Sequence, residues 1–144
     1  DHHLIEIELT ESEDFQNYEI MSGIIDEFKA NGIGTSIDDF GTGFSSLNMI
    51  KEVDLETIKI DKSFIPLETD YPGKDRDLVM FHSIVQLINE LDKKSIAEGV
   101  ETVEQLEYLK GVGCDIVQGY VFDKPLPQEI FKERLASAHP YENI

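Results

Sequence analysis

The stretch GTSIDDFGTGFSS, residues 34 to 46, places two adjacent aspartates at the end of a short apolar run. A turn with two glycines follows, and then two serines that precede a short apolar segment. This order predicts a strand over 34–38, a loop, and a helix over 45–50. Carboxylates side by side repel each other, and divalent cations between them would relieve that repulsion. The stretch therefore predicts either a cation-binding turn at the end of a strand or a plain acidic loop.

Two other ligand-binding motifs are excluded by spacing. A phosphate-binding P-loop requires a lysine and then a serine or threonine after its second glycine, whereas Phe44 follows Gly43 here. An EF-hand calcium loop alternates its acidic ligands ahead of its glycine, whereas Asp38 and Asp39 are adjacent. The choice between a cation site and an acidic loop then depends on what the other strands bring to the same place.

Outside this stretch, hydrophobic periodicity predicts alternating strands and helices. Residues 4–10 (LIEIELT) alternate between apolar and acidic positions, which is typical of a strand. Residues 14–30 carry an apolar stripe at helical spacing, and Thr102 with Gln105 has the capping-box spacing that begins a helix. Five strands alternating with helices indicate an α/β fold with parallel strands. The further elements expected are strands over 57–61, 94–98 and 115–120, a helix after the loop 66–75, a helix from 102 to about 111, and a helix from near 127.

Polar and charged side chains recur near the carboxyl ends of the five predicted strands. In a parallel α/β sheet or barrel these ends meet at one edge, where ligands bind. Carboxylates gathered from separate strands are the ligands that a hard divalent cation needs. The residues expected at this edge are Glu8, Asp38, Asp39, Lys59, Glu98 and Gln118.

Composition limits the partners and the compartment. The 144 residues include 30 acidic and 12 basic side chains, so the net charge is −18. Such a surface repels the phosphates of a long nucleic acid and disfavours an anionic membrane. The sequence has no apolar run of about 18 residues that would predict a membrane-spanning helix. Because the single cysteine, Cys114, suits a reducing compartment, we expect a cytoplasmic protein with no membrane contact by this segment.

Five segments, in this order, resemble the signature segments of the EAL domain family. That family hydrolyses the bacterial second messenger cyclic di-GMP to linear pGpG. The resemblance implies a metal-dependent phosphodiesterase in the bacterial cytoplasm, within a larger signalling protein or by itself, on a TIM-like (β/α) barrel. The segments are IELTE (7–11), DDFGTGFSSL (38–47), IKIDKSFI (58–65), AEGVET (97–102) and QGYVFDKPLP (118–127).

The resemblance also implies catalytic and metal-binding roles. Glu8, Asp38 and Asp39 match metal ligands, with Asp38 as the expected bridge between two Mg²⁺ or Mn²⁺ ions. Lys59 matches the lysine that positions the attacking water and offsets developing charge. Glu98 matches a glutamate that serves as general base or holds the water. Two metals would hold one phosphodiester for in-line attack, and Lys59 would stabilise the transition state.

Further positions are expected to support the site or the substrate. Glu11 matches the glutamate that anchors the loop after Asp39, so the residues that follow Asp39 would form a tethered active-site loop. That loop comprises Phe40, Gly41, Thr42 and Gly43, and the supporting residues are Glu11, Asp61, Glu101 and Gln118.

Structural interpretations compete with some of these roles. Lys59 and Asp61 could form only an ion pair inside a barrel. Glu101 could be a helix cap or a surface group. Glu6, which lies on the same strand face as Glu8, is expected to be buried and hydrogen-bonded.

The resemblance covers the C-terminal part of the family's domain. The Glu-Ala-Leu strand and a metal-binding asparagine, which precede the IELTE segment in the family, have no counterpart in this sequence. A complete barrel of this kind takes about 250 residues, so we expect residues 1–144 to form one incomplete barrel of about five strands, with no second domain. Open strand edges predict pairing with a second copy or completion by an N-terminal segment. We expect the chain alone to be inactive, and the alternative function is a non-catalytic cyclic di-GMP receptor or interaction module.

Overall fold

The computed structural model describes residues 2–10, 17–41, 46–66, 71–137 and 141. Its strands are β1 (Glu6–Thr10), β2 (Gly34–Phe40), β3 (Thr57–Ile60), β4 (Lys94–Ala97) and β5 (Ile116–Val117). Its α-helices are α1 (Tyr18–Ala30), α2 (Ser46–Glu52), α3 (Lys74–Glu90), α4 (Val103–Val112) and α5 (Gln128–Ala136). Two short 3₁₀ helices are η1 (His2–Leu4) and η2 (Lys62–Phe64).

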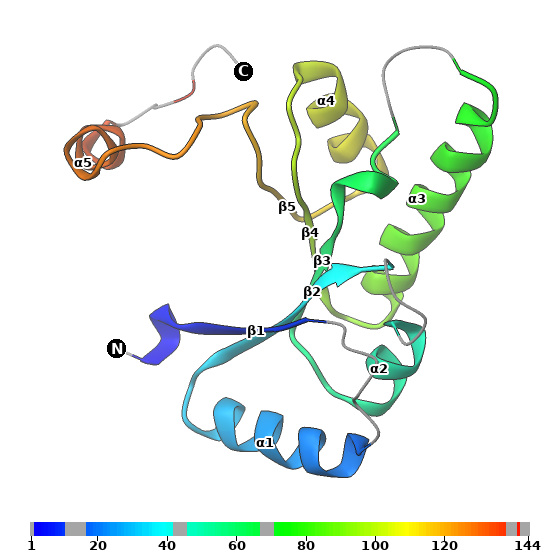
Figure 1. The fold of residues 1–144 in the computed structure, drawn as a ribbon, viewed down its shortest axis with the longest axis vertical. Coiled ribbons are helices and arrows are strands. Elements are labelled where there is room, and N and C mark those ends of the chain that lie inside the picture. The colour runs from blue at the N-terminus through cyan, green and yellow to red at the C-terminus, as the bar shows by residue number, and fades with distance from the viewer. Residues whose placement is uncertain (1, 11–16, 42–45, 67–70, 138–140, 142–144) are drawn as a thin grey trace.

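The five strands form one parallel sheet in chain order, β1-β2-β3-β4-β5 (Figure 1). Each strand pairs in parallel with the next, and helices α1 to α4 make the crossovers. This arrangement confirms the predicted α/β class and the five parallel strands. Because all five strands run the same way, their carboxyl ends lie along one edge of the sheet.

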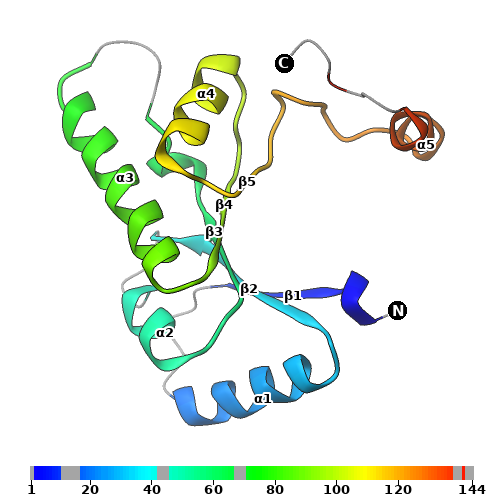
Figure 2. The same ribbon diagram turned by 180° about the vertical axis from the view of Figure 1, so that it is seen from behind.

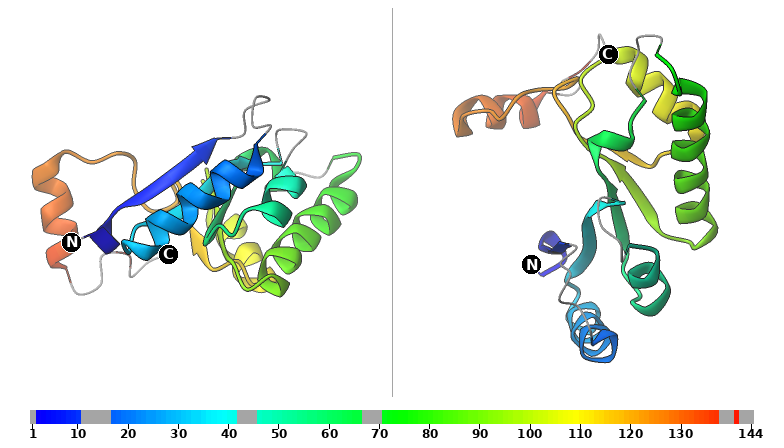
Figure 3. Two further views of the ribbon diagram at one scale, coloured as in Figure 1. Left: turned by 90° about the horizontal axis from the view of Figure 1, so that it is seen from below. Right: turned by 45° about the vertical axis from the view of Figure 1, so that its right-hand side comes forward.

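The hydrophobic core lies between the sheet and the helices α1 to α4, which cover one face (Figure 2). Strand residues Ile37, Ile58 and Ile60 are almost completely buried there. On α3, Phe81 and Val85 lie one turn apart and bury against the same core. In contrast, α5 stands apart from the sheet and has no buried residue (Figure 3).

Element boundaries differ from the expectation at several places. Strand β2 runs to Phe40, two residues beyond the expected 34–38 and into the expected loop. The first strand begins at Glu6 because residues 2–4 form η1. Helix α3 begins at Lys74, inside the expected loop. The residue before it, Gly73, has a left-handed conformation. Strand β5 has two residues instead of six, because after Val117 the chain follows the loop beyond β4. There, the Val100 amide donates to the Gln118 carbonyl at 3.1 Å.

The capping-box prediction for α4 is confirmed. The Thr102 hydroxyl accepts from the Gln105 backbone amide at 3.2 Å. In return, the Gln105 side-chain oxygen accepts from the Thr102 backbone amide at 3.3 Å. The helix ends at Val112, and Gly113, in a left-handed conformation, is its C-terminal cap.

At the amino edge of the sheet, a cluster of charged residues connects α1 with the segments that precede β3 and β4. Asp54, which precedes β3, accepts a hydrogen bond from Lys29 of α1 at 2.6 Å and forms a second ion pair with Lys93 before β4. Hydrogen bonds from Lys29 and then Lys93 lower the pKa of the Asp54 carboxyl to about 2. Among the described residues, no helix combines the length and the apolar character that crossing a membrane requires.

Candidate active site

A bulge at the end of β2 brings Asp38 and Asp39 to the same side of the sheet. Successive strand residues normally point to opposite faces, so two adjacent carboxylates would be separated. Here the β2–β3 register shifts by one residue between the pairs Ile37–Ile58 and Phe40–Ile60. Asp39 has a φ of 53°, a left-handed conformation that aspartate tolerates better than most residues. As a result, Ile37 and Phe40 both bury in the core while the two aspartates face the site.

Lys59 of β3 lies at the centre of the site. Its ammonium donates to Glu8 of β1 at 2.9 Å, to Asp38 of β2 at 2.9 Å, and lies 2.8 Å from Glu98, which follows β4. An ammonium has three hydrogen-bond donors, so three carboxylates match its full capacity. The Lys59 side chain is only 8% exposed. Lys59 therefore links groups carried by four consecutive strands.

The charge state of Lys59 follows from these contacts. Burial by itself lowers the pKa of its ammonium, but hydrogen bonds to Glu98, Asp38 and Glu8 outweigh burial and raise that pKa. Lys59 therefore stays protonated at neutral pH and acts as a fixed positive charge, not as a proton acceptor.

Asp61 does not pair with Lys59. The interpretation of these two residues as an ion pair is therefore wrong. The Asp61 carboxylate caps η2 and accepts from the Ser63 amide at 2.9 Å. Hydrogen bonding from Ser63 holds the pKa of the Asp61 carboxyl below its ordinary value. Asp61 thus shapes the turn that follows β3, while Lys59 binds Glu8, Asp38 and Glu98.

Within the described part of the chain, one group of acidic side chains has the spacing of a metal site. Carboxylate oxygens of Asp38, Asp39 and Glu98 all lie within 4.8 Å of one another. Glu8 is joined to this group through Lys59, and its side chain is 48% exposed. The structure therefore places Glu98 together with the two aspartates, and Glu8 shares the Lys59 ammonium with Asp38 and Glu98.

The remaining expected residues lie on segments beyond β5 and before α4, or outside the described residues. Gln118 is exposed beyond β5, and its backbone amide donates to the Ala97 carbonyl at 2.9 Å. Glu101 is exposed at the start of α4, where its amide donates to the Gln105 side chain. The predicted residues Glu11, Thr42 and Gly43 lie outside the described residues.

The expectation that Glu6 is buried is wrong. Glu6 lies on β1, the edge strand of the described sheet, and it is exposed. The face that it shares with Glu8 is not covered by another described element, so its carboxylate faces solvent.

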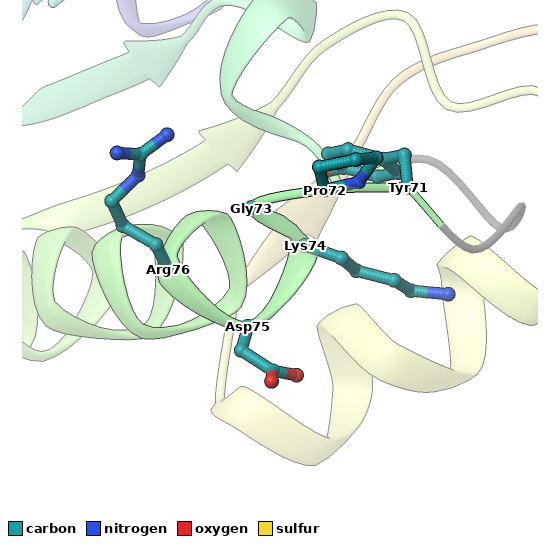
Figure 4. Close-up of a pocket in the computed structure, with 6 residues that line it drawn as sticks. All are labelled: Tyr71, Pro72, Gly73, Lys74, Asp75 and Arg76. Atoms are coloured by element: carbon teal, nitrogen blue, oxygen red, sulfur yellow. The ribbon is translucent and has the colours of Figure 1, made fainter.

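A hollow of about 510 Å³ lies at the start of α3, lined by six consecutive residues (Figure 4). Its charged side chains, Lys74, Asp75 and Arg76, point in different directions and do not converge on one point (Figure 4). None of the lining residues belongs to the carboxylate cluster around Lys59. We assign no ligand to this hollow.

Comparison with known proteins gives this geometry a family context. The EAL domain family matches residues 1–125. Cyclic di-GMP phosphodiesterase NbdA of Pseudomonas aeruginosa is 38% identical over 131 residues, which are 91% of this chain and 16% of that protein.

Solved structures share the fold, and two of them illustrate the match. The EAL domain of Mycobacterium smegmatis DcpA matches with a TM-score of 0.84 and 32% identity, over 94% of this chain and 60% of that one. A manganese and cyclic di-GMP complex of Klebsiella pneumoniae BlrP1 matches with a TM-score of 0.72 and 27% identity, over 85% of this chain and 31% of that one. The chain thus spans less than two thirds of each of these proteins.

Proposed function

The chain belongs to the EAL domain family, and we propose that this protein hydrolyses cyclic di-GMP to linear pGpG with two divalent cations. The observation that carries the proposal is the cluster in which Lys59 bonds three strand-end carboxylates beside the Asp38–Asp39–Glu98 group. The naming of NbdA as a cyclic di-GMP phosphodiesterase supports the choice of substrate.

The donor set fits hard divalent cations. Asp38, Asp39 and Glu98 offer only carboxylate oxygens within 4.8 Å of one another, which suits Mg²⁺ or Mn²⁺ and not a metal that prefers sulfur. We propose that Asp38, Asp39 and Glu8 hold these cations, with Asp38 shared between two. When bound, such cations neutralise phosphate charge and activate water at neutral pH. The manganese complex of BlrP1 supports this assignment.

Lys59 contributes a fixed positive charge. Its raised pKa keeps it protonated, so it can stabilise negative charge that develops on the phosphate oxygens. The Glu98 carboxylate is the proposed proton acceptor for the attacking water, and its 2.8 Å contact with Lys59 fixes its orientation. Both residues lie at strand ends, so the sheet holds them at a constant separation.

The charge of the site makes substrate binding depend on cations. Cyclic di-GMP carries two phosphodiesters, and the chain has a net charge of −18 with a carboxylate-rich edge. One lysine cannot offset these carboxylates and the substrate together, so bound cations must reverse the local sign. We therefore expect little binding of cyclic di-GMP in EDTA.

The test is turnover by the purified intact protein. With Mn²⁺ or Mg²⁺, we expect pGpG to appear by liquid chromatography, and EDTA to abolish it. Asp38→Asn removes a shared ligand charge and should reduce turnover to background. Asp26→Asn, on the exposed side of α1, is the matched control and should keep full activity. Binding without any hydrolysis in either metal would contradict the proposal and favour the receptor alternative.

A further inference from the structure

The position of Asp39 is not set by the β2–β3 ladder. In that ladder Ile37 pairs with Ile58 and Phe40 with Ile60, and the register shift leaves Asp38 and Asp39 between these two pairs. Asp39 and Gly41 both have positive φ, 53° and 96°, so the backbone turns sharply here. The chain just beyond β2 therefore contributes to where the Asp39 carboxylate lies.

Phe64 of η2 packs directly against Gly41. A Cβ built on Gly41 would lie 2.6 Å from Cζ and 2.7 Å from Cε2 of the Phe64 ring. Real Cβ atoms essentially never approach carbon this closely, so the ring occupies the place of the missing side chain. The Phe64 ring also packs against the hydrophobic core, which limits its freedom to move away.

The turn that carries Phe64 is held by its own hydrogen bonds. The Asp61 carboxylate accepts from the Ser63 amide at 2.9 Å, and the Phe64 amide donates to the Asp61 carbonyl at 3.0 Å. The Ile65 amide donates to the Lys62 carbonyl at 3.1 Å. Since η2 begins two residues after β3 ends, its position is tied to the strand that carries Lys59.

The same turn contacts the loop after β4. A Cβ on Gly99, whose φ is 68°, would lie 2.7 Å from the Cβ of Lys62. Gly99 directly follows Glu98, and the Glu98 amide donates to the Ile60 carbonyl at 3.1 Å. One turn therefore touches the chain two residues after Asp39 and one residue after Glu98.

We propose that η2 is a spacer across the site and that Phe64 is a positioning residue for Asp39. The Phe64 ring against Gly41 and the Lys62 stem against Gly99 set the separation of the chain segments that follow Asp39 and Glu98. Asp39 is assigned to the cations and Glu98 to the attacking water beside them, so Phe64 raises cation affinity by holding Asp39 in place, without touching the cation. The inference rests on the proposed function, because it concerns a carboxylate assigned to the cations.

The experiment compares Phe64→Ala with Phe28→Ala in the intact protein. Phe28 is the matched control, because it is also partly buried against the core but lies near the end of α1, at the opposite edge of the sheet. Mn²⁺ titration should show that Phe64→Ala raises the dissociation constant about 10-fold or more, as is typical when a group supporting a ligand is lost. Phe28→Ala should leave it unchanged. If Phe64→Ala does not fold, Phe64→Leu is the milder substitute.

A double-mutant cycle separates a direct contact from general destabilisation. Gly41→Ala alone should also weaken Mn²⁺ binding, because the new Cβ displaces the ring. Added to Phe64→Ala, which makes room for that Cβ, the same change should lose the part of its cost that comes from the clash and keep only the strain of a side chain at a φ of 96°. If the losses of Mn²⁺ affinity in the two single variants simply multiply in the double variant, the two residues do not act through their contact. That result would overturn the inference.

A second readout does not depend on metal. In EDTA, hydrogen exchange of the peptide spanning Ile37–Gly41 should be faster in Phe64→Ala than in Phe28→Ala or the wild-type protein. Unchanged exchange there would overturn the inference whether or not the protein is an enzyme. Mn²⁺ binding without hydrolysis of cyclic di-GMP would instead defeat the proposed function and leave the positioning role standing.

Discussion

Replacing Lys59 with methionine tests the electrostatics of the site most directly. The substitution keeps much of the side-chain volume and removes the one cation that Glu8, Asp38 and Glu98 share at 2.8 to 2.9 Å. The three carboxylates then repel each other without that compensation. We expect a large loss of stability in metal-free buffer and partial recovery when divalent cations take over the neutralising role.

The magnitude follows from the burial of the partners. Removing one member of a buried ion pair costs about 3 to 5 kcal/mol. The Asp38 and Glu98 side chains are 21% and 18% exposed and Glu8 is 48% exposed, so water relaxes part of the repulsion. We therefore take the lower end, about 3 kcal/mol, which corresponds to roughly 6 to 12 °C in Tm for a domain of about 150 residues.

The assay is thermal unfolding of the wild-type protein, Lys59→Met and Lys110→Met, each in EDTA and in Mn²⁺. Lys110 is an exposed lysine on α4 that pairs with Glu107, so Lys110→Met controls for the loss of a surface charge. In the wild-type protein, Mn²⁺ at about 100 times its dissociation constant should add about 2.7 kcal/mol. The gain should be larger in Lys59→Met. A Tm within about 2 °C of wild type in EDTA, or an equal Mn²⁺ gain in both proteins, would refute this reasoning.

Two further predictions concern stability away from the site. The folded-state pKa of Asp54 is depressed to about 2, so its pairing with two lysines stabilises the fold above the unfolded pKa near 4 and is lost as pH falls to about 2. Because the Asp54 side chain is 65% exposed, Asp54→Asn should cost only about 1 kcal/mol at pH 7. A difference from wild type that persists in melts at pH 2 would contradict this. Gly119→Ala puts a Cβ 2.0 Å from the Val100 carbonyl oxygen and should lower the free energy of unfolding by about 1 to 3 kcal/mol, and Tm with it. Gly111→Ala, with nothing within 4 Å of its Cβ, should not lower it, and equal melts for the two variants would argue against the close contact.

The order of elements and the edge that carries the site could be predicted from the sequence. The alternation of apolar and acidic residues over 4–10 and the apolar stripe over 14–30 indicate which faces are buried. Side-chain direction repeats every two residues in a strand and every 3.6 residues in a helix. Parallel strands then place Glu8, Lys59 and Glu98 at one edge for topological reasons alone. The capping box at Thr102 is similarly local, since both partners lie within one turn.

Tertiary structure decided which of these groups meet. A strict alternation sends Asp38 and Asp39 to opposite faces, and only the register shift against β3 turns both toward the site. The alternative in which Asp61 pairs with Lys59 fails, because Asp61 caps η2 and the partners of Lys59 come from β1, β2 and the end of β4. The contact of Phe64 with Gly41 leaves no periodic signal, because it joins residues 23 positions apart through space. Local patterns determine burial and direction along one element, whereas pairing register and loop contacts depend on the whole fold.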